Sequence, residues 1–126
     1  MMFANYLRKT PEDFDVVLGT EAMWLSAVAL GAQAFIPGLG NAFPEICVDL
    51  FKTGINGDII KCREIQKKVN ALRDLMYSVG STVVAVYNML EFRGIVKTFP
   101  RNPFIQMKPD EKNKFKNKLI EFGILE

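Results

Sequence analysis

The spacing of apolar residues changes along this chain, and the change predicts which segments are strands and which are helices. Two short, mainly apolar runs, Asp15–Leu18 and Gln33–Ile36, each end at a turn. Short continuous runs are typical of parallel strands covered on both faces, whereas apolar residues three and four positions apart indicate helices. The helices expected on this basis are Met2–Lys9, Glu21–Leu30, Phe43–Ile55, a long segment that Asp58 caps, Ser81–Arg93 and Asp110–Phe122.

Glycine and proline mark the ends of these segments. A turn at residues 19–21 follows the first apolar run, and a glycine-rich loop at residues 37–40 follows the second. Pro44 suits the first turn of a helix, and Gly57 and Gly94 suit the positions just beyond a helix end. Strand, turn and helix, repeated once, form the basic unit of α/β proteins, in which reactive groups collect in the loops after the strands.

The residues at these turns follow a specific order. A glycine and an acid stand at Gly19 and Glu21, Gly31-Ala32 precedes the second run, and Asn41 precedes Pro44-Glu45. This order resembles the dihydrodipicolinate synthase and N-acetylneuraminate lyase family, from about residue 15 to the C-terminus. Three later features follow the same order: Gly57-Asp58 before a long helix, Gly94, and Arg101-Asn102-Pro103.

The resemblance implies a fold and a chemistry. Members of that family are (β/α)8 TIM barrels that form a Schiff base between a lysine and pyruvate. A complete barrel needs about 250 residues, and this chain has 126. We therefore expect an α/β chain that forms the C-terminal portion of a TIM barrel, mostly helical, with the last two strands in a single unit over residues 1–126. The Schiff-base lysine and the proton-shuttling tyrosine have no counterpart, so no catalytic residue is assigned.

The resemblance also implies substrate-binding roles for the two loops. Gly19 and Thr20 would offer backbone contacts, and Glu21 would accept hydrogen bonds from substrate hydroxyls. Ile36 would line the pyruvate pocket. Pro37 stands where sugar-acid lyases often have a hydroxyl residue, which argues against an N-acetylneuraminate-type substrate. A second interpretation of Glu21 stays open, because an acid at a helix start is favoured by the helix dipole alone.

The lysines of the chain do not meet the needs of Schiff-base chemistry. The reacting amine must be deprotonated near neutral pH, so it has to be desolvated or placed beside another cation. The lysines lie instead among polar neighbours, where solvated side chains are the rule. We expect no catalytic role for those in the helices and the charged tail, namely Lys52, Lys61, Lys67, Lys68, Lys112, Lys114, Lys116 and Lys118.

Composition excludes several other functions. With 49% hydrophobic and 24% charged residues, the chain is expected to be globular. It contains no histidine, which removes Ser-His and Cys-His nucleophile pairs and the commonest metal ligand, and we expect neither a metal nor a cofactor. A net charge of +2 gives no electrostatic reason to expect a nucleic-acid partner.

Two further features bear on the cellular compartment. Cys47 and Cys62 lie in separate expected helices without Cys-x-x-Cys spacing, and we expect buried, reduced thiols in a cytoplasmic protein, although sequence alone leaves a disulfide open. The uncharged stretch Ala22–Pro44 is interrupted at Gly31 and Pro37, short of the ~20 apolar residues that a membrane-spanning helix needs. No membrane partner is expected.

Two functions from different classes remain. The first is a C-terminal segment of a Schiff-base-forming lyase or aldolase that acts on pyruvate-derived 2-keto acids and is not catalytic alone. The second is a non-catalytic helical module for oligomerisation or interaction. Two adjacent strands without the rest of a barrel leave exposed edges and apolar faces, which favour pairing with another chain. Both functions therefore predict a homo-oligomer or a complementary N-terminal barrel fragment as partner.

Overall fold

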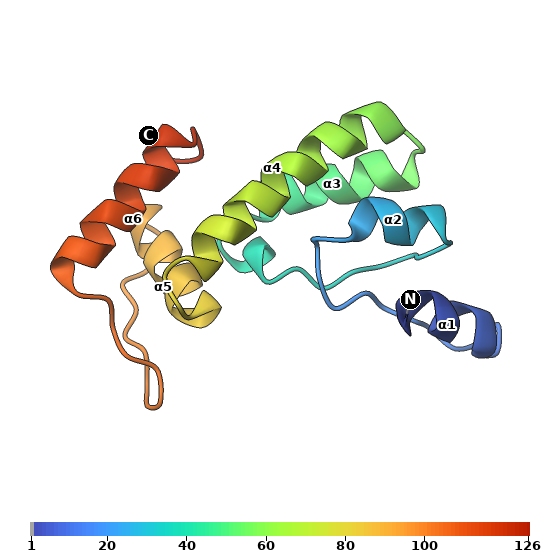
Figure 1. Ribbon diagram of the computed structural model, residues 1–126, viewed down its shortest axis with the longest axis horizontal. Coiled ribbons are helices and arrows are strands. Elements are labelled where there is room, and N and C mark those ends of the chain that lie inside the picture. The colour runs from blue at the N-terminus through green and yellow to red at the C-terminus, as the bar shows by residue number, and fades with distance from the viewer. Residues whose placement is uncertain (1) are drawn as a thin grey trace. The chain divides into compact units, whose positions relative to one another are not determined.

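The computed structural model describes residues 2–126, which are mostly helical (Figure 1). The chain divides into two compact units, which we call unit 1, up to Asn70, and unit 2, Ala71–Glu126. The boundary falls within the longest helix, α4 (Ile59–Tyr77). The organisation as a single unit, expected from the sequence, stays a prediction.

Most helices of unit 1 lie close to the bounds that the sequence indicated, but the helix expected over Glu21–Leu30 was predicted too long and begins only at Trp24. The helices of unit 1 are α1 (Met2–Lys9), α2 (Trp24–Ala29), a short 3-10 helix η1 (Leu39–Asn41), α3 (Pro44–Ile55) and the first part of α4. Pro44 occupies the first turn of α3, where its missing N–H costs no hydrogen bond. Asp58 caps α4 as predicted, because its Oδ1 accepts a hydrogen bond from the Lys61 N–H at 3.0 Å.

The two expected strands were predicted too long. Within residues 2–126 the segments Asp15–Leu18 and Gln33–Ile36 form one isolated parallel bridge, between Leu18 and Phe35. The Leu18 N–H donates to Ala34 O at 3.1 Å, and the Ile36 N–H donates to Leu18 O at 2.9 Å. A strand inside a barrel pairs on both sides, whereas a two-stranded pair alone is only marginally stable, so the extended conformation does not propagate.

The core of unit 1 is built around one tryptophan. The ring of Trp24 has no exposed surface and lies 4.7 Å from the Phe35 ring and 5.3 Å from the Phe51 ring, measured between centroids. Gly54 of α3 allows this packing, since a Cβ atom there would lie 2.4 Å from Trp24 Nε1. These contacts hold α2 against α3, which lie side by side in Figure 1.

Unit 2 is held by apolar packing between two helices, α5 (Thr82–Phe92) and α6 (Pro109–Glu121). Ser81, the residue just before α5, caps this helix: its hydroxyl accepts a hydrogen bond from the Val84 N–H at 3.4 Å. The Phe92 and Phe115 rings meet at a centroid distance of 6.1 Å. Phe115 is buried with Met89 and Leu119, so the three-and-four apolar spacing of α6 faces the core of unit 2.

The structure confirms the expected state of the cysteines. Cys47 and Cys62 are both buried free thiols. The Cys62 thiol lies 3.9 Å from Leu50 O, and this contact joins α4 to α3 within unit 1. None of the helices in the described part of the chain has the length and apolar character needed to cross a bilayer.

Candidate functional site

The parallel bridge between Leu18 and Phe35 brings the two predicted loops to the same edge. The first loop contains Gly19, Thr20 and Glu21, and the second begins at Ile36. Parallel segments end on the same side, so their following loops meet there, as they do at the mouth of a barrel. The structure therefore brings together the segments that the sequence assigned to substrate binding.

Glu21 joins these loops directly. Its side chain has no exposed surface, and the two carboxylate oxygens accept hydrogen bonds from the Gly38 and Leu39 N–H groups, each at 3.2 Å. A buried carboxylate is costly unless hydrogen bonds replace its lost water, and two backbone donors supply them here. The contact of Glu21 with substrate hydroxyls stays a prediction, and in this structure the carboxylate binds the loop.

A residue that the sequence analysis missed, Gln66, holds the backbone of Glu21 by a hydrogen bond. Gln66 of α4 is buried; its Nε2 donates to Glu21 O at 2.9 Å and to Asn70 Oδ1 at 3.0 Å. Its Oε1 accepts from the Leu25 N–H at 3.1 Å. A signal was available, because Gln66 lies three residues before buried Val69 and therefore shares the apolar face of α4, where an amide needs partners.

The other predicted residues differ in how open they are. Ile36 is 69% exposed, whereas Thr20 and Pro37 are half-buried. The Thr20 hydroxyl accepts a hydrogen bond from the Ala22 N–H at 3.2 Å, which stabilises the first loop. In the second loop, Asn41 Nδ2 donates to Gly38 O at 3.0 Å. Both loops are thus shaped by local hydrogen bonds, while the Ile36 side chain is left free at the edge.

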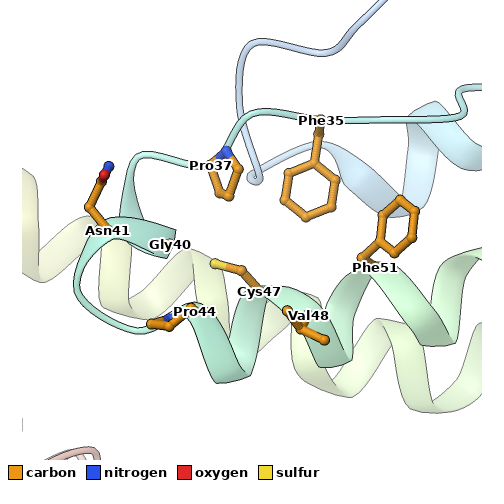
Figure 2. A pocket seen from close by; sticks show the side chains of 8 residues that line it. All are labelled: Phe35, Pro37, Gly40, Asn41, Pro44, Cys47, Val48 and Phe51. Atoms are coloured by element: carbon orange, nitrogen blue, oxygen red, sulfur yellow. The ribbon is translucent and has the colours of Figure 1, made fainter.

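A hollow of about 350 Å³ lies between the second loop and α3. Figure 2 shows the Phe35, Phe51 and Val48 side chains lining it, with the Cys47 sulfur directed toward the loop and the Asn41 amide pointing away. Burial raises the pKa of the Cys47 thiol from 9.0 to about 12, and the negative charges of Glu21 and Glu45 add to the effect. A thiol that stays protonated at neutral pH is a poor nucleophile, so this hollow is apolar surface without reactive chemistry.

Comparison with known proteins finds relatives that match nearly the whole chain. The model of the dihydrodipicolinate synthetase family matches residues 1–121. The 4-hydroxy-tetrahydrodipicolinate synthase of Methanopyrus kandleri is 24% identical over 121 residues, which are 96% of this chain and 40% of the relative. That of Chlorobium phaeobacteroides is 29% identical over 119 residues, which are 94% of this chain and 40% of the relative. The chain therefore spans about 40% of the length of these relatives.

Solved structures give the same picture of the fold. A dihydrodipicolinate synthase from Aquifex aeolicus superimposes with a TM-score of 0.85 at 23% identity, covering 97% of this chain and 41% of the neighbour. A Sulfolobus 2-keto-3-deoxygluconate aldolase superimposes with a TM-score of 0.81 at 19% identity, covering 98% of this chain and 44% of the neighbour. Both neighbours are TIM barrels, and this chain has the fold of their C-terminal portion.

Proposed function

Because this chain belongs to the dihydrodipicolinate synthetase family, we propose that it supplies the C-terminal loops of a Schiff-base-forming lyase or aldolase that acts on pyruvate-derived 2-keto acids. The observation that supports this most is the pair of loops after Leu18 and Phe35, which a parallel bridge holds at one edge. In a barrel, that edge is the mouth where substrates bind. The remaining strands, in the same or another polypeptide, would complete the enzyme.

The environments of the lysines support the view that none of them is the amine that forms the Schiff base. The Nζ of Lys112 is 2.7 Å from Glu91 Oε2, so this amine is engaged in an ion pair. The other lysines are exposed to solvent, whereas a Schiff-base lysine has to be desolvated or placed beside another cation. Residues 2–126 are therefore proposed to bind and orient a keto acid without attacking it.

Within the completed barrel, the exposed and half-buried loop residues would contact the substrate. We assign backbone contacts to Gly19 and Thr20, and a place in the wall of the keto-acid pocket to Ile36. Pro37 offers no hydroxyl donor at its position, and a substrate that needs one there is disfavoured. On this assignment, the part of the substrate that contacts this chain is a short keto acid such as pyruvate.

A replacement experiment tests the proposal. The segment of Aquifex aeolicus dihydrodipicolinate synthase that superimposes on this chain is exchanged for residues 1–126, and the chimera is treated with pyruvate and borohydride. We expect a trapped imine on a lysine of the Aquifex portion, together with lyase or aldolase turnover that the isolated chain lacks. A folded chimera that traps no imine would count against the proposal, as would an imine on a lysine of this chain.

The second function, a non-catalytic interaction module, has one observation in its favour. Several apolar side chains are exposed in each unit, among them Val17 and Ile36 at the bridge in unit 1 and Phe99 and Ile105 in unit 2. Exposed apolar surface favours association with another chain. A uniform homo-oligomer in light scattering, combined with a folded but inactive chimera, would favour this function over the first.

A further inference from the structure

The geometry points to Glu21 as a positioning residue, which fixes the loop that carries Ile36 and Pro37 and does not bind substrate itself. The reaction that this loop serves is the one proposed above, and the inference rests on that proposal only for its effect on catalysis. The structural part, a carboxylate that links the two loops after the bridged segments, stands on the hydrogen bonds of this chain alone.

The two carboxylate oxygens of Glu21 are both engaged. Oε2 accepts from the Gly38 N–H and Oε1 from the Leu39 N–H, 17 and 18 residues further along the chain. Leu39 is fully buried, so no water replaces the carboxylate as a partner for its N–H. If Glu21 turned toward a substrate hydroxyl, a buried donor would lose its acceptor, which opposes such a movement.

The backbone of Glu21 is also held in place. Gln66 donates to its carbonyl oxygen and accepts from the Leu25 N–H at the start of α2. The amide of Gln66 projects from α4, whose hydrogen-bonded helix is stiffer than either loop. A continuous set of hydrogen bonds thus runs from α4 through Glu21 to Gly38 and Leu39, and sets the direction in which the second loop leaves the bridge.

The second loop is compact, so the hydrogen bonds to Glu21 restrict the whole of it. A Cβ atom at Gly40 would lie 2.7 Å from Cγ of Pro37, so the loop folds back closely on itself. Pro37 lies between Ile36, which is exposed at the edge, and Gly38, which Glu21 binds. Release of Gly38 would therefore free the segment that is proposed to line the keto-acid pocket.

Glu21→Gln is the first test, with Glu64→Gln as the matched control. The amide keeps the size of the side chain and one oxygen acceptor, but its NH2 group cannot accept a hydrogen bond. Glu64 is exposed on α4, so its variant makes the same charge change away from the loops. In the isolated 126-residue chain, we expect hydrogen exchange at the Gly38 and Leu39 amides to accelerate by about tenfold or more in Glu21→Gln and to stay unchanged in Glu64→Gln.

Gln66→Met provides a second route if Glu21→Gln does not fold. The methionine preserves much of the volume but removes the bonds to Glu21 and Leu25, so we expect a smaller acceleration at the same two loop amides. Unchanged exchange at Gly38 and Leu39 in either folded variant would overturn the inference. This measurement needs no activity, so it separates the inference from the proposed enzyme function.

The chimera supplies a catalytic readout that general destabilisation would not produce. Because a loosened loop lowers the fraction of binding-competent barrels, Glu21→Gln should raise the KM for pyruvate by about 5-fold while kcat changes less than 2-fold. A direct hydroxyl contact would give the opposite pattern, with pyruvate KM unchanged and the reaction of a hydroxylated aldehyde impaired. That pattern would overturn the positioning role. Faster exchange at the two amides in an inactive chimera would leave that role standing and refute the enzyme function.

Discussion

Unit 1 and unit 2 use buried polar groups in different ways. In unit 1, Gln66 binds the carbonyl of Glu21, 45 residues away, and Glu21 in turn binds Gly38. In unit 2, the buried amide of Asn88 donates at 2.8 Å to Val84 O, one turn earlier in the same helix. The difference indicates that the loop conformation is fixed in unit 1. Directional hydrogen bonds between distant segments restrict the conformation of a loop more than apolar contacts do.

The helices of unit 2 are joined by contacts that have little directionality. Phe115 and Leu119 of α6 are buried apolar residues, and the partly exposed Lys112–Glu91 pair adds a polar contact between α5 and α6. Apolar packing tolerates small rearrangements that keep its volume. Of the two units, unit 1 holds the candidate site.

The largest effect that we expect comes from filling the space beside Trp24. Gly54→Ala places a methyl group 2.4 Å from Trp24 Nε1, so either the ring or α3 has to move. We expect a loss of about 1–3 kcal/mol in the free energy of unfolding of unit 1. Trp24 is the chain's single tryptophan, so its fluorescence during urea unfolding reports on this unit.

Gly19→Ala is the control for this glycine replacement. A Cβ atom at Gly19 has no neighbour within 4 Å, and we expect a change within about 0.5 kcal/mol. Hydrogen exchange in α5 should stay unchanged in both variants if unit 2 is independent of the Trp24 packing. Equal stabilities for Gly54→Ala and the unmodified chain would show that the ring does not pack on Gly54.

The second effect is a dependence of the unfolding free energy on pH, which we expect from the Cys47 thiol in unit 1. Burial raises the pKa of Cys47 to about 12, and the unfolded chain ionises near the ordinary value of 9.0. The stability from this group is therefore complete below pH 9 and is lost as the pH rises toward 12. At 1.36 kcal/mol per pKa unit, the loss by pH 10.5 is about 1–2 kcal/mol.

Cys47→Ala separates this effect from the titration of lysines and tyrosines. The variant loses some packing at every pH, but its unfolding free energy should fall less steeply between pH 9 and 10.5. Urea titrations followed by Trp24 fluorescence measure both slopes. Parallel curves for the two proteins would mean that the thiol ionises as readily in the folded state as in the unfolded state.

The smallest effect belongs to unit 2. The Lys112 Nζ lies 2.7 Å from Glu91 Oε2, with 22% and 26% of the two side chains exposed. Such a pair contributes about 0.5–1 kcal/mol, and salt screens it. A double-mutant cycle of Lys112→Met and Glu91→Gln measures this coupling, with Lys116→Met, an exposed lysine on the same helix, as the control. A coupling that persists undiminished in 1 M salt would contradict a partly solvated pair.

Local chemistry was enough to predict most of the helix ends, although the helix expected from Glu21 begins only at Trp24. Pro44 and Asp58 were expected at the starts of α3 and α4, and Gly94 beyond the end of α5, where it adopts a φ of +69°. Each of these signals acts within about one turn of helix, so the neighbouring sequence contains all the information required. The family was visible for a related reason, since its turn residues keep a fixed order along the chain.

The sequence by itself determined most of the helix bounds and the membership of a barrel family, whereas the structure decided that the two thiols are free. The tertiary structure decided that the strands shorten to one bridge, because two paired segments alone are too marginally stable to sustain a longer ladder. It also decided that Glu21 faces Gly38 and Leu39 and that Gln66 supports it. Such partners lie 17 to 45 residues apart, and only the folded path of the backbone brings their donors and acceptors within hydrogen-bonding distance.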